Sequence, residues 1–307
     1  MSRTQRGAQP PLPTRDGVSP SSVVLPAGNW PDMLSFMTER FPAVTQEAWQ
    51  RRMRAGEIVD AHGMAVMPDE AYRPQRRLYY YRELETEQAI PFEEYIVFQD
   101  DYLVVADKPH FLPVTPSGRY VQETLLVRLK RRLGIDTLSP IHRIDRETAG
   151  LVVFAVQPET RGRYQELFRE KSIRKQYEAI APWRADLAWP MTYRSRIEED
   201  AVRFMQMLTV EGEPNAETVL DVLDVQGLWA RYALSPITGR KHQLRAQCAA
   251  LGMPILNDLI YPELFPEGSD DYARPLQLLA KSIDFDDPIS GQARSFQSSR
   301  TLRFPHE

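Results

Sequence analysis

The stretch IHRIDRETAG at residues 141–150 runs directly into the apolar stretch LVVFAV at residues 151–156. A continuous apolar run of this length predicts a buried strand. The residues before it are polar and dense in charge, which predicts a loop held at the edge of a rigid element. Asp145 lies between Arg143 and Arg146, and nearby cations keep a carboxylate ionised even when it is partly buried. The loop is a candidate catalytic segment, although a solvated loop with local ion pairs would give the same pattern.

Apolar patterning elsewhere predicts a mixed architecture. Residues 95–98 and 102–106 are β-rich and separated by a turn, which predicts two neighbouring strands. Residues 123–133 carry leucines at helical spacing. Further helices are predicted at 161–168 and 241–251, and further strands at 176–180, 219–225 and 228–234. Strands in runs with a few interspersed helices favour an α+β fold, built on a mixed, mainly antiparallel sheet with flanking helices.

Three segments are predicted along the chain. Residues 1–22 are rich in Pro, Ser, Gly and Arg, which is typical of a flexible tail. Residues 23–90 form a small α/β extension, with a helix that ends near Gly56. The sequence is polar and rich in tyrosine before Pro91 and rich in β-forming residues after it. Residues 91–307 are therefore predicted to form the main domain.

Bulk composition narrows the class of protein. The 307 residues are 42% hydrophobic and 26% charged, the balance of an ordinary soluble globular protein. The longest apolar runs are too short to span a bilayer, and residues 1–22 lack the apolar segment of a signal peptide. The one cysteine, Cys248, fits a reducing compartment. These features predict a cytoplasmic protein without a membrane partner.

Basic charge is concentrated in the middle of the chain, although the formal net charge is −4. Residues 119–146 hold seven basic and three acidic residues, residues 161–175 hold six and two, and residues 258–287 hold two and eight. A basic face attracts phosphates even on an acidic chain, whereas a merely solvated surface gives the same pattern. On the predicted 123–133 helix, four leucines would face the core and four basic residues would face solvent or RNA. The leucines are Leu125, Leu126, Leu129 and Leu133, and the basic residues are Arg128, Lys130, Arg131 and Arg132.

Several motifs occur in the order found in one enzyme family. HRIDRETAGL at 142–151 resembles the His-Arg-Leu-Asp-x-x-Thr-Ser-Gly-Leu signature of the RluA-type pseudouridine synthases. KQYEA at 175–179 resembles the family's Lys-x-Tyr strand, and PITGRKHQLR at 236–245, followed by LGMPI at 251–255, resembles its Thr-Gly-Arg-x-His-Gln-Leu-Arg segment. DKP at 107–109 resembles the Asn-Lys-Pro that opens the catalytic domain. The mild departures are Asp107, Ile144, Ala149 and the pair Ala246-Gln247.

The resemblance, which covers about residues 91–285, implies an isomerase that converts uridine to pseudouridine in structured ribosomal or transfer RNA. The reaction breaks the bond from ribose C1′ to uracil N1 and bonds C5 instead, so no redox cofactor is required. By resemblance Asp145 is the catalytic carboxylate, either as a nucleophile at C1′ or as a base at C2′. Arg245 would hold it through a bidentate contact. Tyr177 would pack against the uracil and help to remove the C5 proton.

RNA contacts are also implied. Extruding a base from folded RNA costs a few kcal/mol, and Arg143 is placed by resemblance to fill the vacated space. Further candidate RNA contacts are His142, Arg146, Arg240 and Lys241. No metal, cofactor or protein partner is expected.

Two alternatives remain open. One is a non-catalytic RNA-binding protein on the same fold, which would have no reason to keep Asp145, Tyr177 and Arg245 together. The other is a metal-dependent nuclease using His142, Asp145 and His242, although the two histidines lack a third good metal ligand nearby. WQRRMRAGEIV at 49–59 weakly resembles the small αL-type RNA-binding domain of many relatives, while an extension that packs on the catalytic domain is the alternative.

Overall fold

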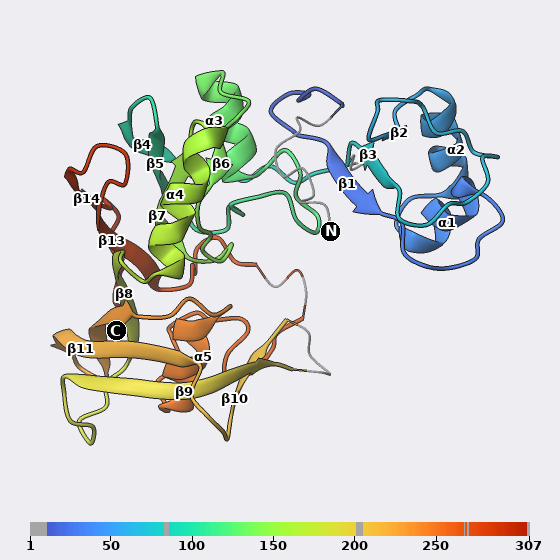
Figure 1. Ribbon diagram of the computed structural model, residues 1–307. Coiled ribbons are helices and arrows are strands. Elements are labelled where there is room, and N and C mark those ends of the chain that lie inside the picture. The colour runs from blue at the N-terminus through green and yellow to red at the C-terminus, as the bar shows by residue number, and fades with distance from the viewer. Residues whose placement is uncertain (1–10, 83–85, 201–204, 267, 269, 306–307) are drawn as a thin grey trace. The chain divides into compact units, whose positions relative to one another are not determined.

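The computed structural model describes residues 11–82, 86–200, 205–266, 268 and 270–305 (Figure 1). The chain divides into two compact units. The first comprises residues 1–88, 116–122 and 127–136, and the second comprises residues 89–115, 123–126 and 137–307. The division at residues 88 and 89 lies close to the expected boundary at Pro91, but two later segments also belong to the first unit.

Among its described residues, the first unit contains a three-stranded antiparallel sheet, two helices before residue 88 and most of a third helix, α3 (Leu125–Leu133). The elements before residue 88 are β1 (Ser21–Val24), α1 (Met33–Arg40), α2 (Gln46–Arg54), β2 (Val59–Asp60) and β3 (Arg77–Tyr80), with strand order β1-β3-β2. Side-chain caps start α1 and α2: Asp32 accepts a hydrogen bond from the Ser35 amide, and Thr45 accepts one from the Ala48 amide. Gly56, at a φ of +72°, follows the end of α2 as predicted.

The structure corrects the end of the predicted flexible tail. Ser21 already belongs to β1, and Val18 is buried with Val121 and Val127. Residues 1–10 of the predicted tail lie outside the described residues.

Helix α3 (Leu125–Leu133) agrees with the predicted helix, but one of its basic residues does not face solvent. Lys130 is buried, and its Nζ donates a hydrogen bond to Ser19 Oγ at 2.8 Å. Arg131 and Arg132 are exposed as expected. The helical spacing wrongly predicted that Lys130 faces solvent. A lysine can be buried when its methylene stem packs among apolar groups and its ammonium reaches a polar partner.

The second unit is built on a mixed, mainly antiparallel sheet of 11 strands among the described residues, which confirms the predicted fold class. The main path is β10-β9-β11-β12-β8-β13-β7-β5-β4, with β14 beside β13 and β6 beside β7. Its strands are β4 (Tyr95–Gln99), β5 (Leu103–Lys108), β6 (Ser139–Pro140), β7 (Ala149–Ala155), β8 (Arg174–Pro182), β9 (Met191–Glu199), β10 (Met207–Val210), β11 (Ala216–Gln226), β12 (Trp229–Pro236), β13 (Leu278–Asp286) and β14 (Ala293–Gln297). Helices α4 (Pro158–Arg169) and α5 (Gln243–Ala250) follow β7 and β12. No helix in the described parts of the chain is long and apolar enough to cross a membrane.

Strand β7 anchors the 141–150 segment in the centre of this sheet. Every residue of β7 is buried, as its apolar run predicts. It pairs antiparallel with β5 and parallel with β13, where Gly150 lies opposite Ala280. Gly150 has a φ of +109°, and a Cβ there would lie 2.2 Å from the carbonyl oxygen of Ala280. Glycine therefore permits both the backbone angle and the close approach of β7 to β13.

Strand β8 lies on the other side of β13. Tyr177 of β8 is also opposite Ala280 of β13, so Tyr177 and Gly150 flank the same residue. The sheet thus brings the end of the 141–150 loop and Tyr177 together, although they are far apart in sequence.

Candidate active site

Asp145 lies in the loop between β6 and β7, with its side chain 26% exposed. The backbone carbonyl of Asp145 accepts a hydrogen bond from the Thr148 amide at 3.2 Å, which closes the loop. Arg245 projects from α5 and its Nη1 donates to Asp145 Oδ2 at 3.3 Å. The carboxylate is therefore reachable from solvent on one side and held by a buried cation on the other.

The guanidinium of Arg245 is gripped by a residue that the sequence did not single out. Asp258 accepts hydrogen bonds from Nε at 2.8 Å and from Nη2 at 2.7 Å, and both side chains are essentially fully buried. The predicted bidentate contact between Arg245 and Asp145 is therefore wrong, because the fork is already occupied by Asp258. Burial acts to lower the pKa of Arg245, but the carboxylates of Asp258, Asp145 and Glu147 together outweigh it and raise the pKa.

Glu147 forms a second carboxylate beside Asp145. Its Oε2 accepts from Arg245 Nη1 at 3.4 Å, and its Oε1 accepts from Arg146 Nε at 2.9 Å. Burial acts to raise the pKa of Glu147, but the two arginines outweigh it and lower the pKa to about 2. Arg245 Nη1 is thus shared between two carboxylates.

Arg146, a predicted RNA contact, points into this network. Its Nη1 and Nη2 donate to the two carboxylate oxygens of Asp270 at 3.0 and 2.5 Å, in addition to its bond with Glu147. Its fork is engaged by carboxylates, so Arg146 orders the loop around Asp145 in this structure.

Tyr177 is partly buried on β8. Burial, reinforced by the negative charge of Asp145, raises the pKa of its hydroxyl above the usual range. The hydroxyl therefore stays protonated at neutral pH. It can donate a hydrogen bond or pack against a base, whereas the expected role in removing the C5 proton would require an ionised phenol that this environment disfavours.

His142, another predicted RNA contact, has a structural role in the unit. Its Nε2 accepts a hydrogen bond from the Val153 amide at 3.1 Å, and its ring stacks on Phe168 at 4.7 Å between centroids. Burial and the nearby charge of Lys175 lower the pKa of His142 to about 3, so the ring is neutral. Within the described residues, no group of three or more His, Cys, Asp or Glu side chains is arranged to hold a metal ion.

His242 and Lys108 complete the surroundings of Asp145. His242 precedes α5 in the left-handed conformation, at a φ of 52°, and its Nε2 lies 3.9 Å from Asp145 Oδ1. Lys108 is fully buried at the end of β5 and donates to the carbonyl oxygens of Pro109 and Arg146 at 2.9 and 3.0 Å. Burial lowers the pKa of Lys108 to about 7, although Glu147 and Asp145 oppose the shift. Lys108 thus holds the backbone one residue beyond Asp145.

The remaining predicted RNA contacts lie at the surface. Arg143, Arg240 and Lys241 are all exposed, and Arg240 Nε donates to the Asn215 carbonyl at 3.2 Å. The structure therefore brings Asp145, Tyr177 and Arg245 together as the sequence predicts. It adds Asp258, which sequence reasoning missed because an isolated acid in an acidic segment carries no pattern. The burial of Lys108 could have been suspected from the sequence, because this lysine ends an apolar strand.

Known proteins resemble this chain in sequence and in fold. A family model described as RNA pseudouridylate synthase matches residues 102–250. An uncharacterized RNA pseudouridine synthase of Synechocystis sp. is 30% identical over 235 residues, which cover 75% of this chain and 79% of that protein. The dual-specificity RNA pseudouridine synthase RluA of Haemophilus influenzae is 31% identical over 212 residues, which cover 68% of this chain and 94% of that protein.

A solved structure supports the fold. Human RNA pseudouridylate synthase domain containing 1 aligns with a TM-score of 0.57 at 22% identity, over 70% of this chain and 86% of that one. This likeness shows that the two chains share a fold. The chain belongs to the RluA-type RNA pseudouridine synthase family, whose members are isomerases.

Proposed function

We propose that this enzyme isomerises specific uridines in structured ribosomal or transfer RNA, with Asp145 as the catalytic carboxylate and without a cofactor. One observation carries the assignment of Asp145: its carboxylate is reachable from solvent while Arg245 holds it, and Arg245 is itself locked by Asp258. A reactive group on a preorganised support is what a catalytic site requires.

The chemistry assigns a role to each side chain. The C1′–N1 bond breaks, the C1′–C5 bond forms, the C5 proton leaves and N1 gains a proton, so atoms balance without an external reagent. Asp145 either attacks C1′ or removes the C2′ proton. Arg245 positions Asp145 through a single donor, and Tyr177, held protonated, packs against or donates to the extruded base.

The RNA substrate is proposed from relatives. A mitochondrial tRNA pseudouridine(32) synthase of Saccharomyces cerevisiae is 32% identical over 177 residues, which cover 54% of this chain and 36% of that protein. The Haemophilus relative is a dual-specificity RNA enzyme by name. Cytoplasmic localisation remains a proposal, supported by the single cysteine, Cys248, which is buried and free.

Release of tritium tests the function. Unmodified ribosomal and transfer RNA transcripts carrying tritium at uracil C5 should lose it to water on incubation with the enzyme, because C5 exchanges its proton for the new bond. The release should need no added metal or nucleotide when the RNA is already folded. A strict requirement for a divalent ion with a pre-folded transcript would instead favour the metal-dependent nuclease.

A further inference from the structure

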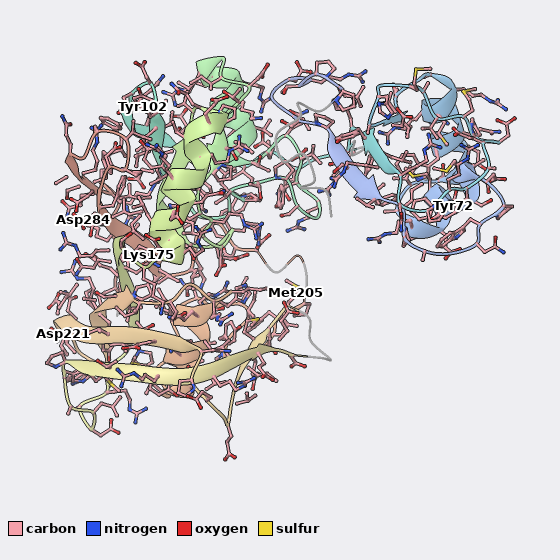
Figure 2. The ribbon with its side chains drawn as sticks, viewed as in Figure 1. Tyr72, Tyr102, Lys175, Met205, Asp221 and Asp284 are labelled. Carbon is pink, nitrogen blue, oxygen red and sulfur yellow. The ribbon has the colours of Figure 1, made fainter. Side chains whose placement is uncertain are left out.

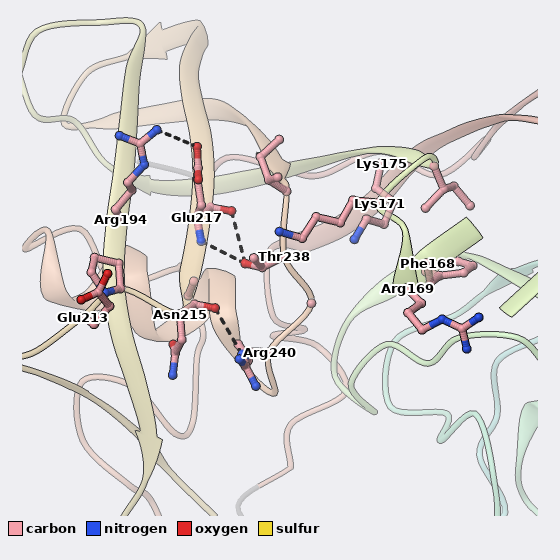
Figure 3. A pocket seen from close by; sticks show the side chains of 15 residues that line it. Phe168, Arg169, Lys171, Lys175, Arg194, Glu213, Asn215, Glu217, Thr238 and Arg240 are labelled. Carbon is pink, nitrogen blue, oxygen red and sulfur yellow. Dashed lines mark hydrogen bonds and ion pairs between the residues drawn. The ribbon is translucent and has the colours of Figure 1, made fainter. Parts of the chain in front are cut away.

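A cleft of about 1000 Å³ opens in the second unit (Figure 3). One wall is the end of α4 and the start of β8, and the other is formed by β9, the start of β11 and the loop between β12 and α5. Lys171 and Lys175 lie on the first wall, and Glu217 and Thr238 lie on the second (Figure 3). Lys175, on β8, lies near the end of α4 that carries Phe168 (Figure 2). None of these residues belongs to the proposed catalytic group.

The lining of this cleft is basic. Its charged residues are Arg169, Lys171, Lys175, Arg194, Glu213, Glu217 and Arg240. Two of the cations are already paired with carboxylates: Arg194 donates to Glu217 at 3.0 Å, and Arg169 pairs with Glu166 outside the cleft. In the described part of the chain, neither Lys171 nor Lys175 forms an ion pair with a carboxylate.

Lys175 is the more informative of these two cations. It is partly buried, and its Nζ lies 5.9 Å from the centre of the Phe168 ring. Burial lowers the pKa of Lys175 from its ordinary value. A desolvated cation without a carboxylate partner is costly, and an anion bound in the cleft would stabilise its charged form.

Three connections join the cleft to the surroundings of Asp145. Phe168 lines the cleft and stacks on His142, which belongs to the same loop as Asp145. Lys175 is two residues before Tyr177 on the same face of β8, a separation of about 7 Å along a strand. The loop before α5 lines the cleft and leads into the helix that carries the arginine of the site. These connections place the cleft beside the residues that surround Asp145.

We propose that the cleft binds the single-stranded RNA that flanks the target uridine, with Lys171 and Lys175 contacting its phosphates. The inference rests on the proposed function, since it extends the same substrate beyond the reacting base. Apolar side chains of the lining offer surface for the bases: Ile237 is exposed and Phe168 is partly buried. A basic groove with apolar surface is typical of sites for single strands.

A salt titration of binding tests this proposal. The probe is a fluorescein-labelled oligouridylate of about 12 nucleotides, within the range of known single-strand site sizes. The double variant Lys171→Gln/Lys175→Gln is compared with Arg163→Gln/Arg174→Gln, which removes the same charge from exposed positions of α4 and β8 outside the cleft. The cleft variant should flatten the dependence of log affinity on log salt by up to about 1.4 units, because each single-strand phosphate contact contributes about 0.7.

The control variant should keep the wild-type slope, and Lys171→Arg/Lys175→Arg should restore it. Parallel slopes for the cleft variant and the wild type would overturn the proposal. A change seen only with a matched duplex probe would overturn the assignment to a single strand. Because Lys171 is exposed, Lys171→Gln alone provides a test that does not disturb packing.

Turnover separates this proposal from the proposed function. Tritium release by the cleft variant should show a raised KM with an unchanged kcat, whereas the control variant should match the wild type. If the wild type releases no tritium from any transcript, the proposed function fails. A lower salt slope of the cleft variant would still place RNA in the cleft.

Discussion

Arg245 is held in a fork by Asp258, with Nε–Oδ2 and Nη2–Oδ1 distances of 2.8 and 2.7 Å. Asp258 also accepts hydrogen bonds from the amides of Ile260 and Tyr261, so the carboxylate that holds the arginine is itself held by backbone. Only Nη1 remains for Asp145. The orientation of the proposed catalytic carboxylate thus depends on a residue that never touches it.

Replacing Asp258 should damage both stability and turnover. Asp258→Ala leaves a buried guanidinium without its partner, which costs about 3–5 kcal/mol of unfolding free energy. Urea unfolding measures this loss, and tritium release measures the fall in kcat. Glu263→Ala, at an exposed position of the same segment, serves as control. An Asp258→Ala enzyme with wild-type kcat would show that Arg245 needs no positioning.

Replacing Asp145 should abolish modification without abolishing binding. Asp145→Asn removes the ionised group but keeps the shape, and one carboxylate contributes little to phosphate-driven binding, so RNA affinity should stay within about tenfold. Tritium release and a binding titration on the same transcript provide the two measurements. Residual turnover close to wild type would rule out Asp145 as the catalytic carboxylate.

Lysine should not replace Arg245. Arg245→Lys keeps the charge but loses the planar fork that Asp258 grips, so we expect turnover nearly as low as that of Arg245→Ala. Single-turnover rates of the two variants decide this point. Near-complete recovery with lysine would mean that charge alone suffices.

Glu147 should make stability depend on acid pH. Because its pKa falls from 4.5 to about 2 on folding, its contribution is fully present above pH 4.5 and is lost as the pH falls toward 2. The full effect is about 3 kcal/mol at 1.36 kcal/mol per pKa unit. Glu147→Gln should remove this part of the acid dependence in urea unfolding at pH 5 and pH 3. The exposed Glu170→Gln should follow the wild type.

Gly150→Ala should destabilise the sheet at the loop that carries Asp145. The φ of +109° and the approach of Ala280 both exclude a Cβ, so we expect a loss of about 1–3 kcal/mol. Gly162→Ala is the matched control, because a Cβ at this position of α4 meets nothing within 4 Å and alanine is the better helix former. Thermal unfolding of both variants measures the difference. Equal midpoints would show that β7 and β13 can separate locally at no cost.

The sequence by itself determined the elements whose cause is local. The apolar run at 151–156 predicts a buried strand, and strand β7 confirms it with bounds shifted by one or two residues. The spacing of leucines in 123–133 and the glycine after the helix at 241–251 correspond to α3 and α5 in the same way. Motif order also identified Asp145, Tyr177 and Arg245 as one group, because each motif is a short pattern of residue types.

Tertiary structure alone decided which side chains share a partner. Strands β9, β13 and β14 escaped the sequence prediction, since charged residues interrupt their apolar pattern, yet β13 is the strand that joins Tyr177 to Gly150. The pairing of Arg245 with Asp258, the burial of Lys108 and the walls of the basic cleft all follow from strand order. Such contacts join residues far apart in sequence, and their geometry depends on sheet pairing that no local propensity encodes.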